Sequence, residues 1–268
     1  IRKTFLRKPV MRANKTATGP ERPMPAKSIM ILGTGSDAGK SVLCTALCRI
    51  FLQDGFRTAP FKSQNMALNS FVTPEGGEIG RSQAVQAQAC RIEPHVRMNP
   101  ILLKPASDTG CQVIINGTPL KNMKSAEYFG YTRKEAMQVV TSSYRRLAED
   151  YDIVVIEGAG SPAEINIAEN DIVNFRTAEM ADAPVLLVGD IDRGGVFASL
   201  YGTLELIQPH ERRRIGGMII NKFRGNKALL QDGLDMMEHR CRVPFLGVLP
   251  YFTDIRIPEE DSVSLEKK

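Results

Sequence analysis

The feature that most constrains the fold is the segment Gly33-Thr-Gly-Ser-Asp-Ala-Gly-Lys-Ser41. An apolar run, Ile29 to Leu32, precedes it, and a stretch of helical period from Val42 to Phe51 follows and is expected to end near Gly55. A glycine-rich turn between a strand and a helix points backbone N–H groups at phosphate oxygens, and the helix dipole favours negative charge there. The segment therefore predicts a phosphate-binding loop.

Within this loop, Lys40 is expected to reach the β and γ phosphates of ATP, and the Ser41 hydroxyl to bind Mg²⁺. The usual pattern is G-x4-GK[ST], and this chain has Thr34 at its first position, with a glycine one place earlier. The loop is thus a variant. The expected nucleotide contacts in it are Thr34, Gly35, Ser36, Asp37, Ala38, Gly39, Lys40 and Ser41.

Two other interpretations of the loop are weaker. Gly33-x-Gly35-x-x-Ala38 also fits a dinucleotide fingerprint, but that site needs an acid after the second strand, where this chain has Lys62. The partition and septum-site switch ATPases carry an additional lysine five positions before the loop lysine. This chain has Gly35 there, so the switch hypothesis lacks its signature charge.

Short apolar runs recur along the chain and alternate with stretches of helical period, which predicts an α/β fold with a parallel sheet flanked by helices. The runs are Ile29–Leu32, Thr58–Phe61, Ile153–Ile156, Val185–Val188, Met218–Ile220 and Phe245–Leu249. Polar residues follow them, and ligands bind beyond the carboxyl ends of such strands. Residues 63–143 are less regular and are expected to contribute helices and a substrate-facing excursion.

Composition excludes some classes of protein. With 43% hydrophobic and 24% charged residues and no apolar run near the roughly 20 residues that span a bilayer, the chain is expected to be cytoplasmic, without a membrane partner. Residues 1–27 hold eight Lys or Arg and four prolines and are expected to form a flexible extension. The remainder carries a net charge of about −2. We therefore expect no nucleic-acid partner.

The five cysteines are scattered, so free thiols in a reducing compartment are expected.

Several strings resemble known families. Gly33–Ser41 with Glu157-Gly-Ala-Gly160 resembles dethiobiotin synthetase, a P-loop family that phosphorylates a carboxylate-derived group. Longer strings in the same order are similar to cobyric acid synthase. They are Phe61-Lys-Ser-Gln-Asn-Met-Ala-Leu-Asn-Ser70, Glu78-Ile-Gly-Arg-Ser-Gln-Ala-Val-Gln-Ala87, Asn99-Pro-Ile-Leu-Leu-Lys-Pro105, Gly189-Asp-Ile-Asp-Arg-Gly-Gly195 and Asn221-Lys-Phe-Arg-Gly225.

The resemblance implies a P-loop domain of the dethiobiotin synthetase type at residues 28–268, a ligase that amidates the b, d, e and g carboxylates of adenosylcobyrinic acid a,c-diamide. It implies ATP and Mg²⁺, a corrinoid substrate, and ammonia from a C-terminal glutaminase domain expected to be absent from this chain. The cobyrinic acid a,c-diamide synthase and dethiobiotin synthetase remain alternatives, and so does a switch ATPase. The oligomeric state stays open, with a homodimer as one candidate.

Catalytic and metal-binding roles are expected at three positions after strands. Lys62 resembles the family lysine that meets the substrate carboxylate and the transferring phosphoryl group, and its alternative is a solvated lysine. Glu157 is expected to bind Mg²⁺ with Ser41, or else to cap a helix. Asp190 is a further metal ligand or a loop-ordering residue. Dethiobiotin synthetases carry an Asp near the position at which the present chain has Gln83. Glu78 or Asp37 are candidates to replace that Asp in metal binding.

Nucleotide and corrinoid contacts are expected elsewhere on the same edge of the sheet. Asn221 is a candidate to hydrogen-bond the purine and Pro250 to pack on it, each with a role in loop structure as the alternative. For a substrate rich in amides and acids, polar side chains are the natural contacts. The candidates are Gln64, Asn65, Asn69, Ser107 and Asp108.

Overall fold

The computed structural model describes residues 26–107, 110–124, 127–128, 135–255 and 257. Residues 1–25 of the expected extension and the substrate candidate Asp108 lie outside these ranges. The first strand begins at Lys27, one residue before the predicted domain boundary.

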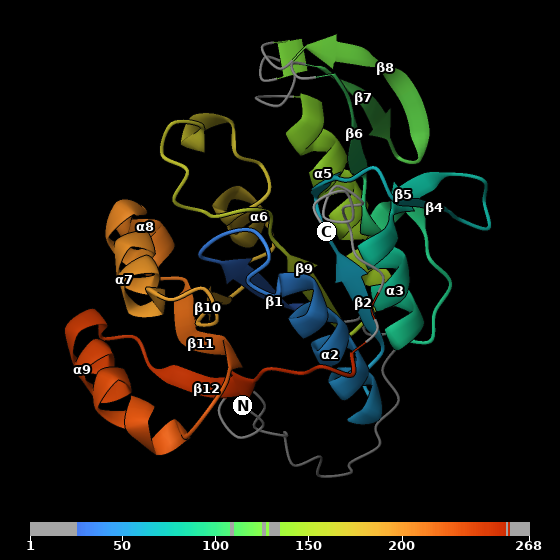
Figure 1. The fold of residues 1–268 in the computed structure, drawn as a ribbon. Coiled ribbons are helices and arrows are strands. Elements are labelled where there is room, and N and C mark those ends of the chain that lie inside the picture. Colours follow the sequence, from blue (N-terminus) through green and yellow to red (C-terminus); the bar gives the residue numbers. More distant parts are fainter. Residues whose placement is uncertain (1–25, 108–109, 125–126, 129–134, 256, 258–268) are drawn as a thin grey trace, which may run out of the picture.

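A parallel sheet of six strands forms the centre of the molecule (Figure 1), in the order β12-β11-β10-β1-β9-β2. All five pairings are parallel. The strands are β1 (Lys27–Gly33), β2 (Thr58–Phe61), β9 (Ile153–Glu157), β10 (Val185–Asp190), β11 (Ile215–Phe223) and β12 (Phe245–Pro250). Each contains one of the predicted apolar runs, so the predicted α/β fold class is confirmed.

Helices cover both faces of this sheet because alternate residues of each buried strand point to opposite sides. On one face, Ile29 and Ile31 pack against α2 (Lys40–Gln53), and α3 (Arg81–Ala89) lies beside α2. Met30 and Leu32 belong to the core of the opposite face. The helices contributing to that core are α5 (Met137–Asp150), α6 (Phe175–Met180), α7 (Val196–Leu206) and α9 (Gln231–Cys241).

The remaining helical segments are short. They are α8 (Pro209–Arg212), η1 (Val96–Met98), η3 (Ala168–Asn170) and η4 (Lys227–Leu230).

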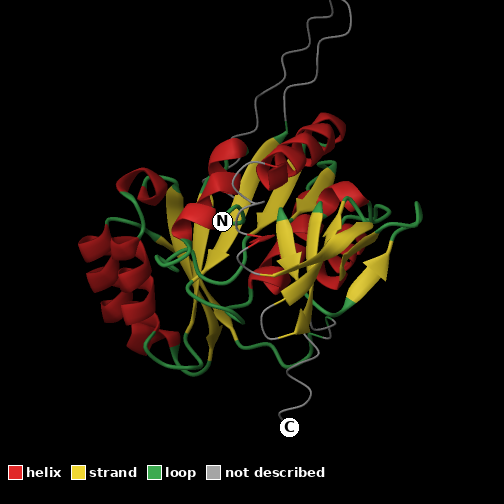
Figure 2. Ribbon diagram, turned by 90° about the horizontal axis from the view of Figure 1, so that it is seen from above, coloured by secondary structure: helices red, strands yellow, loops and turns green. Residues whose placement is uncertain are grey.

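Between β2 and β9 the chain forms a second sheet in the order β3-β6-β7-β8, which lies apart from the central sheet in Figure 2. Its strands are β3 (Gln64–Met66), β6 (Ile101–Ser107), β7 (Gly110–Ile115) and β8 (Thr118–Lys124), and β4 (Ser70–Val72) pairs with β5 (Glu78–Gly80) nearby. The expected helices of residues 63–143 are present as α3 and the first half of α5. Short strands make up much of the rest of the described part of this region, and they were not predicted.

The signal for this sheet was present in the sequence as Asn116-Gly117, which follows the apolar run Val113 to Ile115. Ile115 pairs with Thr118, so these two residues form the loop of the β7–β8 hairpin. Both have positive φ, 47° for Asn116 and 80° for Gly117, as expected for the turn that matches strand twist. The Asn-Gly dipeptide therefore predicts a hairpin, and its significance was missed.

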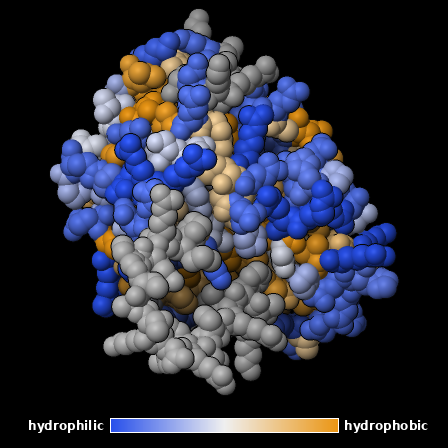
Figure 3. Space-filling view, turned by 180° about the vertical axis from the view of Figure 1, so that it is seen from behind, coloured by the Kyte–Doolittle hydropathy of each residue, from blue (hydrophilic) through white to orange (hydrophobic). Residues whose placement is uncertain are grey.

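The exposed surface has no single apolar band in the described part of the chain. Exposed large apolar side chains occur on separate elements, for example Val72 on β4, Leu120 on β8 and Leu229 on η4. In Figure 3, hydrophilic residues cover most of the visible face, with smaller hydrophobic patches between them. Among the described helices, none has the length and hydrophobicity needed to cross a bilayer.

Substitution of Gly117 tests the hairpin. A Cβ at Gly117 would lie 2.6 Å from the Gly77 Cα, in addition to the strain of its positive φ. Gly76 has a similar φ of 85° but open space around it, so Gly76→Ala is a matched control. We expect Gly76→Ala to lower the free energy of unfolding by about 1 kcal/mol and Gly117→Ala by about 1–3 kcal/mol more. Equal losses in urea unfolding would contradict the close packing of this turn.

Candidate active site

The predicted phosphate loop connects β1 to α2. The Thr34 N–H donates to the Val188 carbonyl at 2.9 Å, which ties the start of the loop to β10. Gly39, the residue before α2, has φ 97°, and a Cβ there would overlap the Asn221 amide. The local backbone therefore requires glycine at this position. This geometry agrees with the strand–loop–helix prediction, and nucleotide contact by residues 34–41 stays a prediction.

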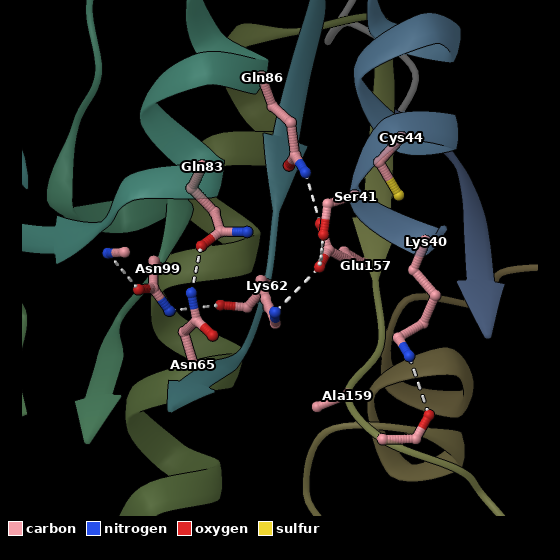
Figure 4. A network of polar contacts seen from close by, with 12 residues as sticks. Lys40, Ser41, Cys44, Lys62, Asn65, Gln83, Gln86, Asn99, Glu157 and Ala159 are labelled. Atoms are coloured by element: carbon pink, nitrogen blue, oxygen red, sulfur yellow. Dashed lines mark hydrogen bonds and ion pairs between the residues drawn. The ribbon is translucent and has the colours of Figure 1, made fainter. Parts of the chain in front are cut away.

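Lys40 is the first residue of α2, and its ammonium group folds back over the loop. Nζ donates to the Gly35 carbonyl at 2.8 Å and to the Gly160 carbonyl at 3.0 Å. The side chain thus bridges the loop and the segment after β9, as Figure 4 shows for the contact with the β9 side. A cation held beside a glycine-rich loop at the start of a helix is suited to binding an anion.

Glu157, the last residue of β9, is the centre of a buried polar cluster (Figure 4). Its Oε1 accepts from Ser41 Oγ at 2.9 Å and from Lys62 Nζ at 2.9 Å. Its Oε2 accepts from the Gln86 amide. The structure therefore brings together Ser41, Lys62 and Glu157, three predicted site residues from three different parts of the sequence.

This cluster is nearly inaccessible to solvent. The side chains of Lys62 and Glu157 are 4% and 0% exposed, so Lys62 is not the solvated lysine of the alternative interpretation. Removing one member of a buried ion pair typically costs about 3–5 kcal/mol, because the other charge is left without compensation. The carboxylate and the ammonium therefore hold each other in place.

The oxygen atoms of the cluster fit a magnesium ion. Ser41 and Glu157 supply a hydroxyl and a carboxylate, which are hard oxygen ligands. Within the described ranges no group of three or more His, Cys, Asp or Glu side chains is arranged to hold a metal. Mg²⁺ usually binds through one or two protein oxygens and completes its coordination with phosphates and water. The protein donors present are therefore sufficient.

A layer of amide side chains, which sequence analysis missed except for Gln83 and Asn65, supports the cluster. Asn99 Nδ2 donates to the Lys62 carbonyl at 3.0 Å, and Asn65 Nδ2 donates to Gln83 Oε1 at 3.0 Å. Gln86 reaches Glu157. The signal was that all of these amides lie inside the strings that carry the family resemblance. Several Asn and Gln side chains within strings that are expected to be buried could have indicated this amide layer.

Asp190 orders its own loop in this structure. Oδ1 accepts from the Asp192 N–H at 2.9 Å, and Oδ2 accepts from Lys222 Nζ at 2.8 Å. These contacts favour the loop-ordering alternative, and a metal-binding role for Asp190 stays a prediction. Asp37 pairs with Arg193 at 3.0 Å on the exposed rim, which does not favour it as the substitute for the missing aspartate.

Glu78, the other candidate substitute, is held by Ser70 and Lys104. Partial burial alone would raise the pKa of this carboxyl, but the hydrogen bonds from Lys104 and Ser70 outweigh it and lower the pKa. Glu78 is therefore ionised and already neutralised by Lys104 at neutral pH. These contacts do not favour Glu78 as a metal ligand either.

The predicted base-binding residues differ in their surroundings. Asn221 is 8% exposed and donates from Nδ2 to the Ala38 carbonyl at 2.9 Å, so it braces the phosphate loop from beneath. This contact favours the loop-structure alternative. Pro250 is exposed at the end of β12, next to Tyr251, on whose ring the Arg224 guanidinium stacks at 3.5 Å. Contact of Asn221 or Pro250 with a purine stays a prediction.

The described substrate candidates lie on two strands of the second sheet and on the segment between β3 and β4. Asn65 is buried, and Gln64 accepts a hydrogen bond from the Tyr128 hydroxyl. The Asn69 carbonyl accepts from the Arg81 N–H at 3.2 Å, at the start of α3. Ser107 ends β6, far along the sequence from the others. Asn65 belongs to the amide layer described above, and corrinoid binding by any of these candidates stays a prediction.

All five cysteines are free, as expected. Cys44, Cys48 and Cys90 are buried in the core between α2 and the sheet. Burial raises the pKa of the Cys48 thiol well above its usual value, with a further contribution from its hydrogen bond with Cys90. The raised pKa suppresses the reactive thiolate of Cys48, which therefore packs as a small apolar core residue.

The role of Asn221 can be tested in the protein without nucleotide. In Asn221→Asp a carboxylate oxygen replaces the donor to the Ala38 carbonyl, so we expect a loss of about 1–3 kcal/mol in the free energy of unfolding. Asn226→Asp is the control, because exposed Asn226 accepts from the Ala228 N–H through Oδ1 and aspartate can do the same. Equal stability of the two variants in urea unfolding would rule out the brace.

Curated relatives named cobyric acid synthase match most of this chain. The protein of Sorangium cellulosum is 59% identical over 91% of this chain and 46% of its own length. The protein of Lachnoclostridium phytofermentans is 60% identical over 89% of this chain and 47% of its own length. The protein of Yersinia enterocolitica is 59% identical over 89% of this chain and 46% of its own length. The chain therefore spans about half the length of these relatives.

Among solved structures, the cell division protein FtsY of Thermotoga maritima matches with a TM-score of 0.48 and 17% identity, covering 89% of this chain and 67% of that one. This likeness is too distant to support a conclusion. Residues 29–265, however, match the family described as the CobQ/CobB/MinD/ParA nucleotide binding domain. The phosphate loop, the buried cluster and all of the parallel sheet except the first two residues of β1 lie within the matched residues. The chain belongs to the CobQ/CobB/MinD/ParA nucleotide binding domain family.

Proposed function

We propose that this chain is the synthetase part of a cobyric acid synthase, a ligase of cobalamin biosynthesis. It uses ATP to activate the b, d, e and g carboxylates of adenosylcobyrinic acid a,c-diamide, and ammonia then converts them to amides. Relatives of that name at 56–60% identity support the assignment. The structural observation that carries it is the convergence of the phosphate loop with the buried Lys62–Glu157 pair.

The chemistry explains why a phosphate loop and a lysine are needed together. A carboxylate is unreactive toward ammonia because oxide is a poor leaving group. In the first step a carboxylate oxygen attacks the γ-phosphorus of ATP, the bond between the γ-phosphorus and the bridging oxygen breaks, and ADP leaves. Ammonia then attacks the acyl carbon, loses a proton and displaces phosphate. Catalysis consists mostly of positioning and charge neutralisation.

The residues of this chain would divide that work. Backbone N–H groups of residues 34–41 and the Lys40 ammonium hold the terminal phosphates. Lys62 would neutralise charge on the substrate carboxylate and the transferring phosphoryl group. It lies one residue beyond β2, at the edge of the sheet where Glu157 also lies. Ser41 and Glu157 would hold Mg²⁺, which when bound neutralises charge on the phosphates. The burial of Lys62 and Glu157 would help to keep water away from the acyl phosphate.

Ammonia would come from a glutaminase domain. The relatives are about twice the length of this chain, which is consistent with such a domain in the whole protein. An ammonium salt can replace that source in an assay of this chain.

The substrate assignment is tested by ADP release in the presence of an ammonium salt with each candidate acid in turn. We expect stimulation by adenosylcobyrinic acid a,c-diamide, with amide products identified by mass spectrometry. Stimulation by cobyrinic acid or by the dethiobiotin precursor alone would favour one of the two related synthetases. ADP release that no acid stimulates would favour the switch ATPase alternative.

Substitution of Lys40 tests the phosphate loop. We expect Lys40→Ala to lower acid-stimulated ADP release by at least about 100-fold, because a charge that stabilises the transferring phosphoryl group is lost. Lys27→Ala is the matched control, since exposed Lys27 lies at the opposite end of β1. Retained turnover in Lys40→Ala, with normal ATP affinity, would overturn the loop assignment.

The magnesium site is tested through Glu157. We expect Glu157→Gln, which has the same shape but no charge, to raise the half-saturating Mg²⁺ concentration for ATP binding by at least about tenfold. Glu149→Gln on the exposed side of α5 is the control. An unchanged Mg²⁺ requirement in isothermal titration would remove Glu157 from the metal site.

A further inference from the structure

We infer that Gln86 is a positioning residue that fixes the orientation of the Glu157 carboxylate for metal binding. The inference rests on the proposed function, in which Glu157 binds Mg²⁺. Gln86 lies on α3, within the substrate-facing excursion, and no motif assigned it a role. Its side chain extends from α3 toward the end of β9 in Figure 4.

The hydrogen bonds to Glu157 divide between its two carboxylate oxygens. Ser41 and Lys62 both donate to Oε1, each at 2.9 Å. Gln86 donates to Oε2. The last torsion of a glutamate side chain has a broad, roughly two-fold energy profile, so a carboxylate held at one oxygen can still rotate. The contact with Gln86 holds the second oxygen and fixes the plane of the group.

The buried Gln86 amide also carries a cost in stability, because one of its polar atoms has no partner among the described residues. Gln86 is 0% exposed, and its Oε1 has no hydrogen-bond partner among the described residues. Burying an unpaired acceptor costs about 1–3 kcal/mol. An apolar side chain of similar size would avoid that cost on this helix. The amide is oriented so that its N–H meets Glu157, while its carbonyl stays unpaired.

The other amide on the same face of α3 does not contact Glu157. Gln83, one turn earlier, uses Oε1 to accept from Asn65. Its amide nitrogen has no partner and therefore does not reach Glu157. Gln86 is thus the α3 side chain that contacts the carboxylate. Residues that hydrogen-bond a metal ligand without touching the metal typically change metal affinity 10–100-fold when they are replaced.

The experiment measures Mg²⁺-dependent ATP binding by isothermal titration in Gln86→Met, which keeps the size of the side chain and removes the donor. We expect the half-saturating Mg²⁺ concentration to rise about 10–100-fold. ATP affinity in EDTA and the melting temperature report on general packing, and we expect metal-free affinity to change less than about twofold. Gln88→Met, at an exposed position of the same helix, is the control and should match wild type.

A second variant distinguishes loss of the hydrogen bond to Glu157 from loss of the polar group and from failure to fold. Gln86→Asn keeps an amide but is one methylene shorter and cannot reach Glu157, so it should show the same shift as Gln86→Met. It also serves as the test if Gln86→Met does not fold. A wild-type Mg²⁺ requirement in the folded variants, or an equal loss of metal-free ATP affinity, would overturn the positioning role.

Glu157→Gln distinguishes this inference from the function on which it rests. If Glu157→Gln raises the Mg²⁺ requirement and the Gln86 variants do not, the positioning role is wrong and the metal site stands. If Glu157→Gln has no effect, the metal site itself is misplaced and both conclusions fall.

Discussion

The structure depends on one buried interaction, the ion pair between Lys62 and Glu157. Two charges inaccessible to water are tolerated only with close geometry and further hydrogen bonds, and here Ser41 and Gln86 supply those bonds. The pair joins the ends of β2 and β9, which are neighbours in the sheet, and Ser41 brings in the start of α2. A phosphate loop alone is common to many nucleotide-binding proteins. The buried pair holds the Lys62 ammonium on the same Glu157 oxygen that accepts from Ser41, next to that loop.

The long excursion between β2 and β9 is connected to this pair. Asn99 donates to the carbonyls of Lys62 and Ile101, and it accepts from the Gly80 N–H. The second sheet, the β4–β5 ribbon and the backbone beside Lys62 therefore share one buried side chain. α3 begins directly after Gly80 and carries Gln86, which contacts Glu157. Changes in the excursion would consequently be transmitted through Asn99 to the backbone beside Lys62.

Prediction from the sequence was accurate where local signals dominate. The apolar runs of the central sheet, the loop before α2 and the positions of Lys62 and Glu157 at strand ends follow from period, turn residues and the rule for parallel sheets. It was poor for residues 63–143, where strands are short and the pairing β3–β6 joins segments separated by some thirty-five residues. Short apolar runs fit either a strand or a buried helix, and the Asn-Gly turn was the discriminating signal.

By itself the sequence determined that a glycine-rich loop would connect a buried strand to a helix, because glycine geometry and helical period act over a few residues. It also determined which charged residues would stand at the ends of buried strands. Only the tertiary structure decided which of these charges meet. Glu157 contacts Ser41, Lys62 and Gln86, residues 71 to 116 positions away along the chain, whereas Asp190 pairs with Lys222 and Asp37 with Arg193. Strand order and register set these partners, and neither is encoded in any local stretch of residues.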